Sequence, residues 1–365
     1  MRRVKFGDVV KRVNIYVDRF NTDRLYYVGK GGSIEPNALD IKPQAKIKGS
    51  TIGFKFHFGF DPGHILFMSR CFDQHKAATA TFAGVCSDST YVVETCDENV
   101  LLQRYLQLVM QSDDFWNWCE EHKSGGVNFL INYSTLETYE FTLPSLSEQK
   151  LLADKLWAAY RVKESYKKLL AATDDMLKAK FQEMFGGQGV VTLSEACDIV
   201  MGTSPDSQYY NTNCEGLPFY QGKTEFTDMY IGGAEVWCTK PIRVAEKNEI
   251  LMSVRAPVGA INIAAEKCCI GRGLCSIKPK DNVTKLLFVF YALKLQEEEI
   301  SRLGTGSTFK AVNKDQVYNK ITLPLPPLPL QQQFVEIATQ AEATKESFRK
   351  SIENIDQVIK SLINQ

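Results

Sequence analysis

The stretch "ITLPLPPLPLQQQFVEIA" at residues 321–338 decides the fold, because the chain contains its pattern twice. It leads from β-type residues through Leu-Pro into a helix start that carries glutamine. The stretch "FTLPSLSEQKLLADKL" begins at residue 141, 180 residues earlier, and does the same. Solenoid repeats have periods of about 20–50 residues. A period this long therefore predicts two copies of one module.

Earlier parts of the chain match at a similar offset. "GHILFMSR" at 63–70 corresponds to "NEILMSVR" at 248–255, and "VKFGDVVKRV" at 4–13 corresponds to "VTLSEACDIV" at 191–200. Each copy consists of short β-type runs punctuated by Gly and Pro. One helical stretch is predicted at 101–122 in the first copy and at 286–303 in the second.

A long polar helix with a narrow apolar seam ends each copy. A seam of this width favours pairing of two helices over burial in a globule, so the two helices are expected to pair as a coiled coil. At 1.5 Å per residue, helices of this length span about 50 Å. The predicted seam residues are Leu152, Ala159, Val162, Tyr166, Leu169, Thr173 and Met176 in the first helix, and Phe334, Ile337, Ala341, Thr344, Phe348, Ile352, Ile355 and Leu362 in the second.

Composition excludes several classes of protein. No window approaches 18 consecutive apolar residues, and the first twelve residues lack the apolar core of a secretory signal. We therefore expect no membrane contact, a cytoplasmic location and reduced thiols. The ten cysteines lack C-x-x-C spacing, and the four histidines match no metal-site spacing, so no metal site is expected.

The charge of the chain is zero overall but uneven along the sequence. Residues 1–55 carry twelve Lys and Arg against five Asp and Glu, and residues 238–285 carry nine against four. Such separation is compatible with two basic faces, one in each copy.

Two glycine motifs resemble nucleotide sites but do not fit them. "GLPFYQGKTEF" at 216–226 has five residues between Gly216 and Gly222 where a P-loop has four, and one of them is a proline. "FGGQG" at 185–189 fits the glycine pattern of an S-adenosylmethionine site, but it ends a predicted helix, where glycines serve as a C-cap. The Asn/Asp-Pro-Pro-aromatic tetrapeptide of adenine methylases is absent from the chain. No catalytic activity is expected.

Several stretches together carry a family resemblance. They are "ILMSVRAPVGAINIAAEKCCIGRGLCSIKP" (250–279), "MGTSPDSQYYN" (201–211), "GLPFYQGKTEF" and "LPLPPLPLQQQ" (323–333) in the second copy, and "YYVGKGGSIEP" (26–36) and "ATFAGVCSDSTYVV" (80–93) in the first. They resemble the DNA-specificity subunit of type I restriction–modification systems. The resemblance covers nearly the whole chain and is stronger in the second copy, since Met68-Ser69-Arg70 replaces Ser-Val-Arg in the first.

The resemblance implies an α/β (α+β) fold with two similar target-recognition domains, related by a pseudo-two-fold axis and separated by two long antiparallel helices. The expected domains are 1–147 and 188–328, with spacer helices at 148–187 and 329–365. The implied function is sequence-specific binding of a bipartite double-stranded DNA target. The implied partners are two modification subunits along the helices, which methylate adenine N6 with S-adenosylmethionine, and restriction subunits that use ATP and Mg²⁺. No cofactor is expected on this chain.

Polar residues beside Gly or Pro turns are the candidate DNA contacts. Gln221 is suited to adenine, and Lys223, Arg255 and Arg272 are suited to guanine or phosphate. Lys310 follows a Gly-rich turn, whose N–H groups suit phosphate. The other candidates are Thr203, Ser204 and Ser253 in the second copy, and Ser69, Arg70 and Ser87 in the corresponding places of the first.

Two alternative functions remain open. The chain could be the recognition part of a single-chain restriction–methylation enzyme, which the neighbouring genes would show. It could also be a coiled-coil scaffold with no role in DNA binding, which the zero net charge favours. A scaffold predicts no salt-dependent affinity for DNA.

Overall fold

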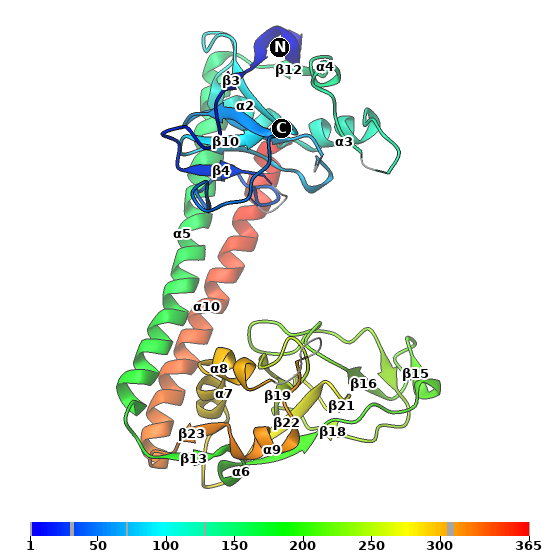
Figure 1. Ribbon diagram of the computed structural model, residues 1–365, viewed down its shortest axis with the longest axis vertical. Helices are drawn as coiled ribbons and strands as arrows, with labels where there is room; N and C mark the ends of the chain where they lie inside the picture. The colour runs from blue at the N-terminus through cyan, green and yellow to red at the C-terminus, as the bar shows by residue number, and fades with distance from the viewer. Residues whose placement is uncertain (1, 30–32, 71, 128, 305–309, 365) are drawn as a thin grey trace. The chain divides into compact units, whose positions relative to one another are not determined.

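The computed structural model describes residues 2–29, 33–70, 72–127, 129–304 and 310–364 (Figure 1). The chain separates into two compact units. Unit 1 consists of Met1–Lys167 and Arg349–Gln365, and unit 2 consists of Lys168–Phe348. The long helices α5 (Leu146–Phe185) and α10 (Leu328–Ile363) each contribute one stretch to each unit.

Unit 1 is an α/β assembly of short strands and short helices. In chain order its elements are β1 (Arg2–Lys5), α1 (Phe6–Val9), β2 (Val10–Arg12), β3 (Ile15–Tyr16), β4 (Tyr26–Val28), β5 (Asp40–Ile41), β6 (Ala45–Lys46), β7 (Phe56–Phe60), β8 (Ile65–Met68), a 3₁₀ turn (Phe72–Gln74), β9 (Ala77–Ala80), β10 (Gly84–Ser87), β11 (Thr90–Thr95), α2 (Gln103–Val109), α3 (Asp113–Glu121), α4 (Tyr133–Leu136) and β12 (Glu140–Leu143).

Unit 2 follows the same plan. Its elements are β13 (Val190–Thr192), α6 (Leu193–Ala196), β14 (Cys197–Met201), a 3₁₀ turn (Ser207–Tyr209), β15 (Tyr210–Asn211), β16 (Leu217–Tyr220), β17 (Trp237–Cys238), β18 (Val244–Ala245), β19 (Ile250–Ser253), β20 (Ile261–Ile263), β21 (Cys268–Ile270), β22 (Leu274–Pro279), α7 (Leu286–Lys294), α8 (Glu297–Leu303), α9 (Lys314–Asn319) and β23 (Thr322–Pro324).

Strand order confirms the predicted duplication. One sheet runs β2-β11-β8-β9-β5 in unit 1 and β14-β22-β19-β20 in unit 2. A second runs β6-β4-β10-β7-β3 and β15-β17-β16-β21-β18, and both have one parallel pair at the same place, β4 with β10 and β16 with β21. Helix α2 packs on β9 and β11, and α7 packs on the equivalent β20 and β22. Strands β1 and β12 pair in unit 1 as β13 and β23 do in unit 2.

A buried glutamine fixes the start of each long helix to its own unit. In unit 1 the Gln149 side chain accepts a hydrogen bond from the N–H of Leu102 (2.9 Å) and donates to the carbonyls of Val100 and Pro144 (both 3.0 Å). In unit 2 Gln331 accepts from the N–H of Lys285 (3.0 Å). It also accepts from the Thr284 hydroxyl and donates to the carbonyls of Val283 and Pro326. Both glutamines are fully buried.

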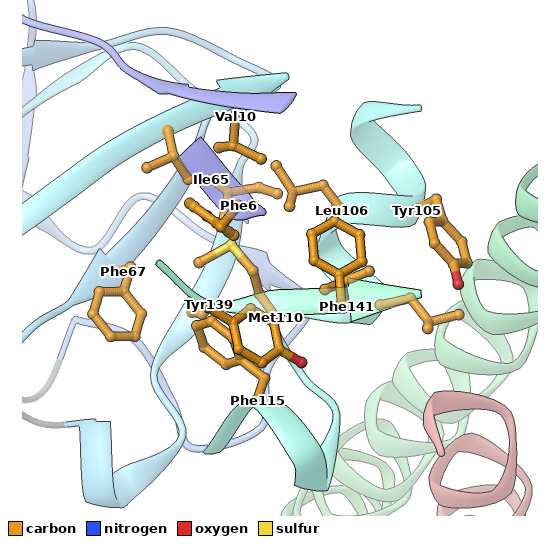
Figure 2. Packing of buried hydrophobic residues seen from close by; sticks show 14 of the residues in the cluster. Phe6, Val10, Ile65, Phe67, Tyr105, Leu106, Met110, Phe115, Tyr139 and Phe141 are labelled. Carbon is orange, nitrogen blue, oxygen red and sulfur yellow. The ribbon is translucent and has the colours of Figure 1, made fainter. Parts of the chain in front are cut away.

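Aromatic side chains form the centre of the unit 1 core (Figure 2). Phe67 on β8 meets Phe115 on α3 edge to face, with ring centroids 5.9 Å apart, and Phe115 meets Tyr139 in the same way at 5.2 Å. The Tyr139 hydroxyl lies at the border of the core and donates a hydrogen bond to the Asp114 carboxylate at 2.8 Å. Each such buried ring contributes about 1.5–3 kcal/mol through its removal from water. The core therefore joins β8, α3 and the segment before β12.

The predicted helices at 101–122 and 286–303 are each two helices, and this part of the prediction is wrong. In unit 1 the break falls at Ser112, whose hydroxyl accepts a hydrogen bond from the N–H of Phe115 at 3.1 Å and so caps α3. In unit 2 the break falls at Gln296, whose amide donates to the carbonyls of Ala292 and Thr322. An N-cap side chain therefore interrupts the helical pattern in unit 1, whereas in unit 2 a side chain that bonds the last turn of α7 does so.

The predicted seam of α5 is also wrong in detail. Val162, Leu169 and Met176 have 47%, 46% and 45% of their surface exposed. The buried α5 side chains include Leu156, Tyr160, Leu177 and Phe181. Helix α5 packs against the globular part of each unit as well as against α10. The buried face of the helix therefore differs from the predicted seam.

The two long helices run antiparallel within each unit. In unit 2 the Phe181 ring packs edge to face against Phe334, and the Asp174 carboxylate forms an ion pair with Lys345 at 2.6 Å. Burial lowers the pKa of Lys345, but its hydrogen bonds to Asp174 and Glu342 outweigh this effect and leave the pKa above the ordinary value. In unit 1 Lys163 pairs with Asp356 in the same sense.

We predict that Gln331→Ala lowers the free energy of unfolding by about 1–3 kcal/mol, because it leaves buried N–H and C=O groups without partners. The matched control is Gln333→Ala, two residues along the same helix and exposed, which should change stability by less than about 0.5 kcal/mol. Urea denaturation of the full chain measures both. Equal stability of the two variants would contradict the anchoring role of Gln331.

Candidate nucleic-acid interface

The ends of several strands converge at one edge of unit 2. Strand register places Met201 opposite Cys275 and Ser253 opposite Leu274, so β14 and β19 both end where β22 begins. The parallel pair β16 and β21 ends at the same edge, with Tyr220 beside Ile270. Loops 202–204, 221–223, 255–257 and 271–273 therefore lie close together.

Glycines allow these loops to approach one another. A Cβ added to Gly273 would lie 2.0 Å from the Gln221 carbonyl oxygen, and one added to Gly202 would lie 2.2 Å from the Gly271 carbonyl oxygen. Backbone hydrogen bonds complete the contact, with the N–H of Gly271 donating to Tyr220 (2.8 Å) and that of Thr203 donating to Ile270 (3.1 Å). No other residue type would fit at positions 202 and 273.

These loops enclose a cationic cleft of about 210 Å³, which includes Lys223, Arg255 and Arg272. No carboxylate is among its lining residues, and all three cationic side chains are exposed. In the part of the chain that the structure describes, the cationic group of none of the three takes part in an ion pair or a hydrogen bond. The residues that line the cleft are Gln221, Gly222, Lys223, Arg255, Ala256, Pro257, Arg272 and Gly273.

Arg255 and Arg272 both line this small cleft. The residues next to them are joined by the hydrogen bond from the N–H of Val254 to the Gly273 carbonyl (2.9 Å). Like charges held within one small cleft repel one another. An anionic or electron-rich ligand between them would remove that repulsion, which suits phosphate or the O6/N7 edge of guanine.

Other candidates in unit 2 surround or support this cleft. The Ser204 hydroxyl accepts from the N–H of Arg272 (3.2 Å) and from the Gln221 amide (3.4 Å), so it orients both. Lys310 is exposed, and its carbonyl accepts from the N–H of Ala256 (3.0 Å), beside the cleft. Thr203 is exposed at the same edge. The turn at 305–309 lies outside the described residues.

Ser253 has a role within the protein instead. It is 1% exposed, its hydroxyl donates to the Pro257 carbonyl (2.8 Å) and it accepts from the N–H of Ala260 (3.0 Å). Both hydrogen bonds hold the turn that presents Arg255. We therefore propose no DNA contact for Ser253.

The three candidates in unit 1 are placed differently. Ser69 and Ser87 are buried, and both hydroxyls bond to Ser89, Ser69 to its carbonyl (2.8 Å) and Ser87 to its hydroxyl (2.9 Å). These hydrogen bonds hold the β10–β11 turn, so we propose no DNA contact for either serine. Arg70 is exposed and lines a hollow of about 390 Å³ together with Asp73, Glu120 and Lys123, among others. The structure does not repeat the purely cationic cleft here.

Sequence reasoning missed the small residues of the cleft, Gly222, Ala256, Pro257 and Gly273. The signal was available, since "GRG" at 271–273 surrounds an arginine with two glycines at the start of a strand. Neither glycine motif forms a nucleotide site. "GLPFYQGKTEF" forms strand β16 followed by a loop. Gly187, with φ of 85°, lies two residues after Phe185, the last residue of α5, which agrees with the predicted C-cap.

Three buried thiols of this chain are poorly suited to metal binding. Burial raises the pKa of Cys86, Cys268 and Cys275 to about 12, so these thiols stay protonated at neutral pH. Within the described ranges, no three His, Cys, Asp or Glu side chains are grouped to hold a metal ion. The helices described here also include none with the length and apolar character needed to span a membrane.

We predict that Arg272→Gln raises the free energy of unfolding by about 0.2–1 kcal/mol at low salt, because it removes one of three like charges that line the same exposed cleft. The gain should shrink near 1 M salt, where charges are screened within about 3 Å. Lys320→Gln removes an exposed charge of unit 2 outside the cleft and is the control. Denaturation in urea at both salt concentrations tests this, and a loss of stability in Arg272→Gln would refute it.

Comparison with known proteins shows which proteins this chain is similar to. Residues 187–357 match the model of the type I restriction modification DNA specificity domain. Over 256 residues the chain is 34% identical to a putative type I restriction enzyme MjaX specificity subunit of Methanocaldococcus jannaschii. That match covers 64% of this chain and 60% of the relative, so it spans less than two thirds of the relative's length.

Solved structures agree over nearly the whole chain. A chain described under "Structural basis underlying complex assembly and conformational transition of the type I R-M system" is 26% identical, has a TM-score of 0.58 and aligns over 99% of this chain and 96% of its own. The S subunit of a type I restriction–modification system from M. genitalium shares the fold, with a TM-score of 0.60 at 14% identity over 99% of this chain and 94% of its own. Residues 187–357 are thus similar to the DNA-specificity domain of type I restriction–modification systems, and the whole chain shares the fold of an S subunit of such a system.

Proposed function

We propose that this chain reads a bipartite double-stranded DNA target and directs the activity of partner subunits without catalysing a reaction itself. The observation that carries the proposal is the cleft of unit 2, where Lys223, Arg255 and Arg272 meet without a carboxylate in a domain of the DNA-specificity family. Unpaired cations on loops are the groups that bind phosphates and guanine edges.

The duplication supports a target in two parts. Units 1 and 2 share strand order, parallel pair and helix placement, so each can present loops from the same edge to one block of sequence. We propose that unit 2 contacts its block through Gln221, Lys223, Arg255, Arg272 and Lys310, with Thr203 and Ser204 beside them. Arg70 is the proposed contact of unit 1 that occupies the place of Arg255.

Partner subunits are proposed to bind the long helices. Leu169 and Met176 on α5 are nearly half exposed, although apolar, which suits a surface covered in a larger assembly. We propose two modification subunits there, using S-adenosylmethionine to methylate adenine N6, and restriction subunits that use ATP and Mg²⁺, with no cofactor held by this chain. The proposed site of action is the cytoplasm.

The deciding experiment is single-molecule sequencing of adenine methylation in cells that co-express this chain with the modification subunit encoded beside it. We expect methylation at one motif made of two short specific blocks around a fixed unspecific gap. Folded and associated proteins that give no methylation would contradict the proposal and favour a scaffold. A neighbouring reading frame that fuses methylase and recognition segments would favour the single-chain alternative.

We predict that Arg255→Ala relaxes one block of this motif and leaves the other unchanged. Loss of a bidentate contact to a base should cost about 1–3 kcal/mol in discrimination at one position. The methylated motif of the variant reports this directly, with Lys320→Ala as a charge-matched control outside the cleft. An Arg255→Ala motif identical to that of the wild-type chain would remove Arg255 from the reading surface.

A further inference from the structure

The β10–β11 turn of unit 1 is the structural equivalent of the β21–β22 turn of unit 2. In unit 1 the N–H of Ser69 donates to the Ser89 carbonyl (3.0 Å), as Val254 donates to Gly273 in unit 2 (2.9 Å). The N–H of Ile131 donates to the Ser69 carbonyl (3.1 Å), as Val312 donates to Val254 (2.9 Å). The four hydrogen bonds make position 69 equivalent to 254, and position 89 equivalent to 273.

Arg70 follows position 69 as Arg255 follows position 254, and Asp88 precedes position 89 as Arg272 precedes position 273. The same alignment therefore makes Arg70 equivalent to Arg255 and Asp88 equivalent to Arg272. Unit 2 thus presents two cations at this place, whereas unit 1 presents a cation and an anion.

Asp88 is available to a ligand. Its residue is exposed, and its N–H is bonded to the Lys55 carbonyl (3.0 Å), so the turn is held by the backbone. Among the residues that the structure describes, its carboxylate takes part in no hydrogen bond or ion pair, not even with Arg70. Fold stability therefore does not account for an aspartate at this position.

We propose that Asp88 reads a cytosine in the half of the target that unit 1 contacts, and is a specificity-determining residue of this chain. This inference rests on the proposed function. A carboxylate is repelled by phosphate, so at a DNA-facing turn its favourable partners are base amino groups. In the major groove cytosine offers the N4 donor alone, whereas adenine places the N7 acceptor beside its N6 donor, which would repel the second carboxylate oxygen.

The test is the methylated motif of the wild-type chain, Asp88→Ala and the control Glu121→Ala, each co-expressed with the modification subunit. Glu121 is an exposed carboxylate at the end of α3 in the same unit, so it matches the change in charge. The block of unit 2 is identified as the one that Arg255→Ala relaxes. In the other block we expect one cytosine to lose about 5- to 150-fold in discrimination in Asp88→Ala only.

A second variant tests the chemistry of the contact. Asp88→Asn keeps an acceptor oxygen and adds amide donors, so it should accept adenine as well as cytosine at the affected position. Thermal melting of each variant checks that it is folded.

Two results overturn the inference while leaving the proposed function intact. One is an Asp88→Ala motif identical to that of the wild-type chain, and the other is a wild-type block of unit 1 that contains no cytosine. A wild-type chain that directs no methylation overturns the proposed function itself, and with it the role of Asp88.

Discussion

The hydrogen bonds of one buried glutamine in each unit are the constraint on which the other elements depend. Gln149 joins the start of α5 to the start of α2, and Gln331 joins the start of α10 to the start of α7. Each glutamine also bonds the carbonyl of the proline that precedes its helix. Helices α2 and α7 pack on the sheet whose edge carries the candidate DNA contacts, here called the reading edge. In each unit the glutamine therefore connects the long helix to that sheet through one short helix.

The reading edge combines a fixed backbone with free side chains. Hydrogen bonds between main-chain atoms at positions 69 and 89, and at 254 and 273, set the turns in the two units. The residues presented by those turns, Arg70 and Asp88 in one unit and Arg255 and Arg272 in the other, contribute none of these bonds through their side chains. A scaffold of this kind holds contact groups in place before a ligand binds, which lowers the entropic cost of binding.

The sequence was sufficient for the duplication, the mixed α/β modules and the existence of two long helices, because Leu-Pro-x-x-x-x-Gln patterns and β-type runs are local signals. It failed where tertiary contacts decide. Val162 and Leu169 fit a helical seam by spacing, yet packing against the globular parts buries Leu156 and Leu177 instead. Ser253 and Ser69 have the chemistry of DNA contacts, but register turns them inward, and no local pattern reports register.

Register also explains why the first copy was hard to interpret from its residues. Ser87 seemed the counterpart of the polar residues in the second copy, whereas the hydrogen-bond pattern aligns it with Gly271 and aligns Asp88 with Arg272. A search for basic residues overlooks an aspartate, although recognition of bases needs acceptors as much as donors. An anion facing DNA weakens binding to every sequence through phosphate repulsion and can be favourable only where an amino group meets it. Because the repulsion between Asp88 and phosphate is offset only where a base amino group meets the carboxylate, Asp88 favours sequences that offer that group.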